Sequence, residues 1–166
     1  MTPAADARER RRRAAARFKP DLVDTLLVDE APPSALDRYF YFEDVDTHDS
    51  LFRYVVRAAL GESPTRDKTP YLHALRDQGW FLIDAVEEPF RHRRDVVTRA
   101  LPDLVRRIRA LSPERVVLIG ARLYDEVYDG LRSARVPVAD VRLPYPGSGQ
   151  QRRFLDGFAE TLGGHA

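Results

Sequence analysis

The stretch LVDTLLVDEAPP, residues 22–33, decides the expected fold of this chain. Its first seven residues form a short apolar run bounded by polar residues and prolines, a pattern that is typical of a buried β-strand. The segment that follows, residues 29–47, is too rich in proline and aromatic residues for a simple connection, and its length indicates a functional loop.

Three more apolar runs and five helical patterns follow this first strand. The runs cover residues 80–86, 115–120 and 138–143, and the helical patterns cover about 48–60, 69–78, 91–111, 121–133 and the last residues from about 149. Helices that alternate with apolar strands predict an α/β fold of three layers, α/β/α, with a four-stranded, mostly parallel sheet covered on both faces. Ligands bind such a sheet beyond the carboxyl ends of its strands, so the loops after the strands should meet there.

The composition excludes several classes of protein. The 166 residues include no cysteine, so a disulfide framework, a thiolate nucleophile and a zinc knuckle are excluded. The four histidines show no metal-site spacing, no apolar run approaches the roughly 18 residues of a membrane span, and the N-terminus lacks the apolar core of a signal peptide. We therefore expect a soluble, cytoplasmic protein with no membrane contact, no metal and no other cofactor.

Basic residues are concentrated at the N-terminus. The first 20 residues contain seven basic side chains and two acidic ones, whereas the rest of the chain contains 20 basic and 24 acidic ones. We therefore expect a basic N-terminal arm over residues 1–20 and a single domain over residues 21–166. Such an arm could attract nucleic acid weakly and in a salt-sensitive manner. The simpler alternative is a solvated, partly helical extension.

Four motifs give the chain a resemblance to the uracil-DNA glycosylase superfamily. Residues 28–33, VDEAPP, are similar to the first motif of its Gly-Glu-Ala-Pro-Gly branch, and residues 82–89, LIDAVEEP, resemble its central strand. Residues 115–127, RVVLIGARLYDEV, are similar to the strand-Gly-Ala-helix element before the last motif, and residues 144–151, PYPGSGQQ, stand where the family has His-Pro-Ser. The resemblance covers roughly residues 22–162 and implies a four-stranded parallel sheet between helices. It also implies DNA repair chemistry, namely hydrolysis of the N-glycosidic bond of a damaged or modified base in DNA.

Three positions depart from the family pattern. The family's first glycine is Asp29 here, its base-reading asparagine is Asp84, and its catalytic histidine is Tyr145. Because a fold can outlast its chemistry, two alternatives to a glycosylase stay open. One is a catalytically inactive protein of the same fold that binds a nucleobase, a nucleotide or DNA. The other is a protein-interaction module that uses the arginine arm.

The resemblance assigns roles to residues of the first two motifs. Glu30 would orient the attacking water and lie near the positive charge that develops on the sugar; alternatively, it caps a loop amide or pairs with an arginine. Phe42, in the aromatic run 39–42, would stack on an extruded base unless it only fills the core. Asp84 would read the base edge. An ionised Asp84 only accepts hydrogen bonds, whereas a buried, protonated carboxyl would also donate one. Its other role is that of a strand-end residue bonded to loop amides.

The segment PYPGSGQQ predicts an anion site at a helix start. Ser148 followed by Gln151 forms a capping box, which places the start of the helix near Gly149. Gly147 and Gly149 would let the backbone approach a DNA phosphate or the anionic oxygen of the leaving base. Tyr145 would donate a hydrogen bond as the family's histidine does, but a phenol supplies no positive charge. A plain helix start explains the same glycines and serine.

Overall fold

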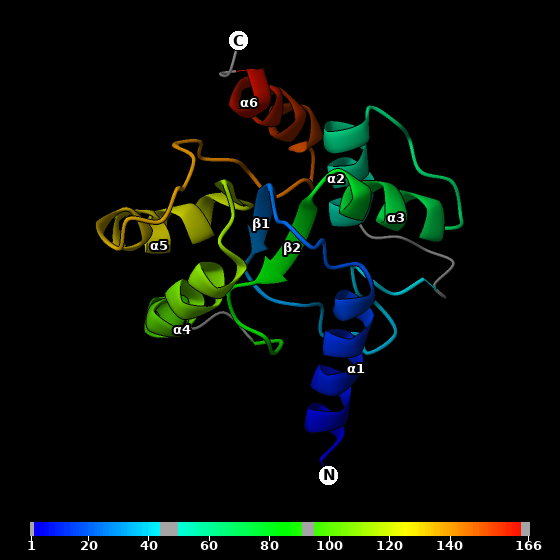
Figure 1. The fold of residues 1–166 in the computed structure, drawn as a ribbon, viewed down its shortest axis with the longest axis horizontal. Coiled ribbons are helices and arrows are strands. Elements are labelled where there is room, and N and C mark those ends of the chain that lie inside the picture. The colour runs from blue at the N-terminus through cyan, green and yellow to red at the C-terminus, as the bar shows by residue number, and fades with distance from the viewer. Residues whose placement is uncertain (1, 44–49, 91–94, 164–166) are drawn as a thin grey trace.

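A parallel sheet of three strands lies at the centre of the fold (Figure 1). The computed structural model describes residues 2–43, 50–90 and 95–163. The strands stand in the order β2-β1-β3, and their bounds are β1 Thr25–Asp29, β2 Trp80–Asp84 and β3 Arg115–Leu118. Every residue of the central strand β1 is buried, as expected for a strand covered on both faces. The register pairs Asp29 with Asp84, so the last residues of β1 and β2 lie side by side.

Six helices are formed by the described residues. They are α1 Pro3–Arg17, α2 Ser50–Leu60, α3 Thr69–Asp77, α4 Val96–Leu111, α5 Ala121–Ser133 and α6 Gln151–Gly163. Helix α4 packs against α5 on one side of the sheet, and α2 packs against α3 and α6 on the other (Figure 1). The predicted α/β class is therefore confirmed, although the helix starts predicted at 48 and 91 lie outside the described residues. None of the helices described here is long and apolar enough to cross a bilayer.

The predicted fourth strand, residues 138–143, is not a regular strand. The chain runs parallel to β3 and makes two isolated bridges, from Val138 to Val116 of β3 and from Leu143 to Ile119, the residue after β3. Between these bridges the side chains of Asp140 and Arg142 bind residues of α5, at 2.6 and 2.7 Å. Because these contacts hold the segment toward α5 rather than along β3, the sheet has three strands and not four.

Side chains close the outer edge of β2. The Tyr41 hydroxyl accepts a hydrogen bond from the N–H of Leu82 at 2.7 Å and donates one to its C=O at 3.1 Å. Arg107 of α4 donates to the C=O groups of Asp84 and Ala85, at 2.8 and 2.7 Å. Buried backbone groups are costly when they are left unpaired, so these contacts stabilise the edge strand. They also hold the aromatic run and α4 at the end of β2, where the candidate site lies.

Candidate functional site

A cavity of about 360 Å³ opens at the carboxyl ends of β1 and β2. Its walls come from the loop after β1, the end of β2, the aromatic run, the start of α5 and the loop before α6. The volume lies in the range of small-molecule sites, roughly 300–1,000 Å³, and is suited to one planar ring. Three predicted site residues, Glu30, Asp84 and Tyr145, are brought together on these walls.

The surroundings of the Asp84 carboxyl disfavour its ionised form. Asp29 and Asp84 are each 7% exposed and stand opposite each other on adjacent strands. Burial raises the pKa of Asp84 well above its usual value, and the negative charge of Asp29 raises it further, against the opposing charges of Arg11 and Arg107. A protonated carboxyl offers one O–H donor and one C=O acceptor, the same pattern as an asparagine amide. Of the two states considered for Asp84, the structure therefore favours the one that can donate.

Glu30 is fixed beside this acid by the backbone. The ladder between β1 and β2 continues past the strand ends, because the Ala85 N–H donates to the Asp29 C=O at 2.7 Å and the Val86 N–H donates to the Glu30 C=O at 3.0 Å. The Glu30 residue itself is only half-buried and lines the cavity. A carboxylate held in this way at the mouth of a cavity can orient a water molecule and accept its proton.

The aromatic residues that line the cavity are Tyr39, Phe40, Phe90 and Tyr145, and the predicted Phe42 is not among them. The Phe42 N–H donates to the Tyr39 C=O at 3.1 Å, so the run 39–42 is a turn and its side chains do not alternate as in a strand. The Phe42 ring is instead buried against Tyr39, at 5.3 Å between centroids, and against the Arg10 guanidinium, at 4.2 Å. Phe42 therefore fills the core, which is the alternative role considered for it, and Phe40 lies where a base could stack.

The segment before α6 forms a second hollow of about 570 Å³ that shares Tyr145 with the cavity. Gly147 and Ser148 line this hollow together with Arg153. Helix α6 begins at Gln151, two residues later than predicted, and Ser148 has φ 50°, in the left-handed region rather than the extended geometry of an N-cap. The predicted capping box is therefore wrong, because the chain turns at Ser148 before the helix starts.

Arg122 is a cavity residue that sequence reasoning missed. It is the second residue of α5, which follows directly on Gly120. Arg122 adds a positive charge to a wall that also carries Tyr145. The available signal was its place inside the strand-Gly-Ala-helix motif, where a helix start faces the carboxyl edge of the sheet.

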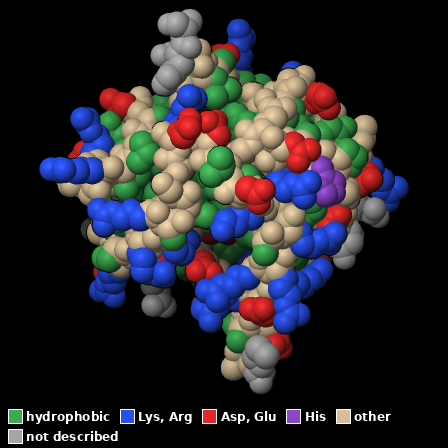
Figure 2. All heavy atoms as spheres, in the orientation of Figure 1, with side chains coloured by type: hydrophobic (Ala, Val, Ile, Leu, Met, Phe, Trp, Pro, Cys, Tyr) green, Lys and Arg blue, Asp and Glu red, His purple; other side chains and the backbone are tan. Residues whose placement is uncertain are grey.

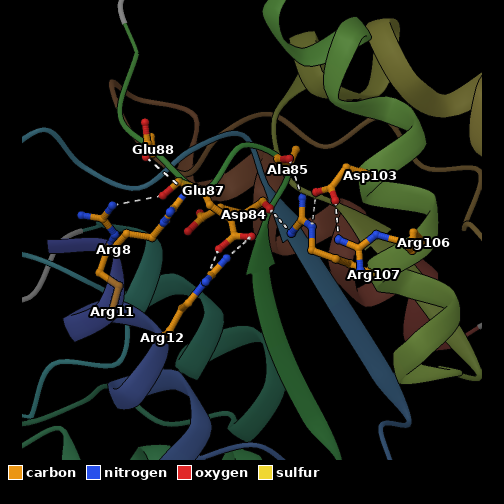
Figure 3. A network of polar contacts seen from close by, with 10 residues as sticks. All are labelled: Arg8, Arg11, Arg12, Asp84, Ala85, Glu87, Glu88, Asp103, Arg106 and Arg107. Carbon is orange, nitrogen blue, oxygen red and sulfur yellow. Dashed lines mark hydrogen bonds and ion pairs between the residues drawn. The ribbon is translucent and has the colours of Figure 1, made fainter. Parts of the chain in front are cut away.

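Helix α1 docks on the loop that follows β2 (Figure 3). Arg11 donates to the Glu87 C=O at 3.0 Å, and Arg12 binds the Glu87 carboxylate at 2.9 and 3.3 Å. Arg8 pairs with Glu88 at 3.4 Å. The residues predicted as a basic arm are thus largely helical and bound to the domain, and their arginines hold the loop that directly follows Asp84.

The described residues were searched for groups that could bind a metal ion, and the sequence was compared with those of known proteins. In the ranges 2–43, 50–90 and 95–163, no three His, Asp or Glu side chains are grouped so that they could hold a metal ion. No protein-family model matches the chain, and no curated protein sequence is significantly similar to it.

Proposed function

We propose that the cavity binds a planar nucleobase and that the protein hydrolyses the N-glycosidic bond of a damaged or modified base in DNA. One observation carries this proposal: a buried acid that favours its protonated form, Asp84, stands beside the more exposed Glu30 in a cavity with an aromatic wall. A buried acid whose environment favours its proton, placed in a cavity, is one of the marks of a functional site.

The base would be recognised by stacking and by edge hydrogen bonds. The ring of Phe40 would stack on one face of the base. The protonated Asp84 would accept a hydrogen bond from a ring N–H and donate one to the adjacent ring carbonyl, whereas an ionised carboxylate would repel that carbonyl. In this arrangement the protonated aspartate would make the same hydrogen bonds as an asparagine. The replacement of the family's asparagine by Asp84 is therefore compatible with a uracil-like base edge as well as with one rich in amino groups.

The bond would be cut by water under the control of Glu30. The carboxylate would orient the water toward the anomeric carbon, accept its proton as the C–O bond forms, and stabilise the positive charge on the sugar. The electron pair of the breaking C–N bond leaves with the base. Tyr145 would donate a hydrogen bond to the anionic oxygen of that base, and the Arg122 guanidinium supplies positive charge on the same wall.

A second candidate function is binding of a nucleobase without hydrolysis. It is favoured by Tyr145, because a neutral phenol stabilises a leaving anion less than an imidazolium would. Both candidates require the same cavity and the same protonated Asp84, and they differ only in turnover.

The test is a panel of oligonucleotides that each carry one damaged or modified base. Abasic sites are detected as strand breaks after alkaline treatment, and binding is followed in parallel by the thermal shift with free bases. Glu30→Gln is expected to reduce excision by about 10²–10⁴-fold while leaving binding intact. Glu62→Gln, an exposed residue after α2, serves as the control and should excise at the wild-type rate.

The outcomes separate the two candidates. Excision of any base in the panel, lost in Glu30→Gln but not in Glu62→Gln, supports the glycosylase. Thermal stabilisation by a base without excision supports binding alone. A folded protein that neither cuts the panel nor is stabilised by any base contradicts both.

A further inference from the structure

A second groove, of about 450 Å³, runs between α1 and α4 along β2. Six cationic side chains line it: Arg8, Arg11, Arg12, Lys19, Arg106 and Arg107. Figure 3 shows how α1 and α4 approach the end of β2 from opposite sides and direct their arginines toward it. In the space-filling view, basic side chains gather in the lower half of the molecule, over α1 (Figure 2).

The positive charge of this groove is only partly neutralised by the protein. Arg11 is 7% exposed and donates to a backbone carbonyl, which satisfies a hydrogen bond but brings no negative charge. Arg106 and Arg107 share one carboxylate, that of Asp103. Arg12 pairs with Glu87 and Arg8 with Glu88, so three paired carboxylates, those of Glu87, Glu88 and Asp103, stand against the six cationic side chains. Within the described residues, the groove therefore keeps an excess of positive charge.

The floor of the groove is apolar. Phe81 and Ile83 of β2 lie at its base, with Leu111 at the end of α4. A basic rim over an apolar floor is suited to a polyanion whose charges are carried on a chain and whose rings or sugars can cover carbon atoms. Groups of this kind occur together in single-stranded nucleic acid, where bases are free to leave the stack.

The groove and the base cavity share part of their walls. Tyr39, Leu82 and Asp84 line both. The two hollows are therefore neighbours, and a free base is too small to occupy both. A polymer with a phosphate on each side of the bound base reaches both at once.

We propose that the groove between α1 and α4 binds the phosphodiester backbone of a single-stranded nucleic acid and leads that strand into the base cavity. This inference rests on the proposed function in naming the strand as the substrate, but the groove can be tested without any turnover. Helix α1 then has a binding role of its own, although it lies outside the part of the chain that resembles the glycosylases.

The test uses a fluorescein-labelled 12-nucleotide thymidine strand without damage, and fluorescence anisotropy at 50–200 mM salt. The test variant is Lys19→Gln/Arg106→Gln, two exposed positions on the groove rim. The matched control is Arg57→Gln/Arg152→Gln, which removes the same charge from exposed positions of α2 and α6 that do not line the groove. Wild-type protein and both variants are first shown to have the same thermal unfolding midpoint.

The rim variant should bind more weakly, and the slope of log K against log salt should fall by about 1.4, since each phosphate contact on a single strand contributes about 0.7. The control should keep the wild-type slope. A strand with an uncharged methylphosphonate backbone should not bind to the wild-type protein. Equal effects of the two double variants, retained binding of the uncharged strand, or preference for the duplex over the single strand would each overturn the proposal.

The same data distinguish failure of this inference from failure of the proposed function. Binding of the undamaged strand with the expected slopes, but no excision in the panel, supports the proposed binding groove and contradicts the proposed glycosylase activity. Excision that is equally fast in wild-type and rim-variant protein, with no loss of affinity, supports the proposed glycosylase activity and contradicts the proposed binding groove.

Discussion

Replacement of Asp84 by asparagine is expected to stabilise the protein at neutral and alkaline pH. The asparagine side chain has the shape and hydrogen-bonding pattern of the protonated acid, but it cannot ionise. Asp29 and Asp84 are paired in register on strands that lie about 5 Å apart, and at an effective dielectric constant of about 20 two such charges repel by about 3 kcal/mol. At pH 8 the wild-type protein either bears this repulsion or avoids it by holding a proton that the unfolded chain would release; the asparagine avoids both costs, so the expected gain is on the order of 3 kcal/mol.

The gain should depend on pH with a definite sign. The pKa of Asp84 is raised in the folded state, so the folded protein holds this proton more tightly than the unfolded chain does. Its contribution to stability is complete below the ordinary value of 3.8 and is lost as the pH rises through the raised folded-state value. Wild-type protein should therefore lose stability relative to Asp84→Asn as the pH rises, and the two should be similar at pH 4.

Urea unfolding at pH 4, 6 and 8 measures this difference. The single tryptophan, Trp80, lies in β2 and reports the unfolding of the strand that carries Asp84. Asp129→Asn, at an exposed position of α5, is the control and should show no pH-dependent gain. If Asp84→Asn is no more stable than the wild type at pH 8, Asp84 is ionised and well paired in the folded protein, and the reading of a base by a protonated acid is refuted.

Three further changes test the framework around the site. Tyr41→Phe should cost about 2–4 kcal/mol in urea unfolding, because it leaves a buried N–H and C=O of β2 without their hydroxyl partner. Glu87→Gln should lower the free energy of unfolding by up to about 1 kcal/mol at pH 7, because the bidentate contact with Arg12 is lost. This contact keeps the pKa of Glu87 below its ordinary 4.5, so the difference between variant and wild type should be lost as the pH falls through the lowered folded-state pKa. Gly79→Ala should destabilise more than Gly61→Ala in thermal unfolding. Both glycines have φ of 70–79°, but an added Cβ meets a side-chain carbon at 2.9 Å only at position 79.

The sequence was sufficient to predict the elements whose signal is local. The strands β2 and β3 lie within the predicted apolar runs, and β1 overlaps its run but ends one residue later. Helices α2 to α6 follow the predicted amphipathic patterns, because residue spacing encodes burial on two faces or on one stripe. The meeting of Glu30, Asp84 and Tyr145 could be predicted because the carboxyl ends of parallel strands share an edge.

The parts that were missed depend on contacts between distant segments. The apolar pattern of residues 138–143 predicts a strand, and it gives no sign that Asp140 binds Tyr124 of α5. The resemblance points to Phe42 as the stacking residue, but the run turns, and Phe40 lines the cavity instead. The docking of α1 depends on pairs such as Arg12 with Glu87, which are 75 residues apart and have no local signature.

The closure of the β2 edge by Tyr41 and Arg107 links the solubility of the protein to the shape of its pocket. An open strand edge is a template on which another extended chain can add, and such addition is a common route to aggregation. The two side chains that occupy this edge also fasten the aromatic run and α4 around the end of β2. A substitution that uncovered the edge would therefore distort the ligand cavity and invite self-association at the same time, so selection for either property preserves the other.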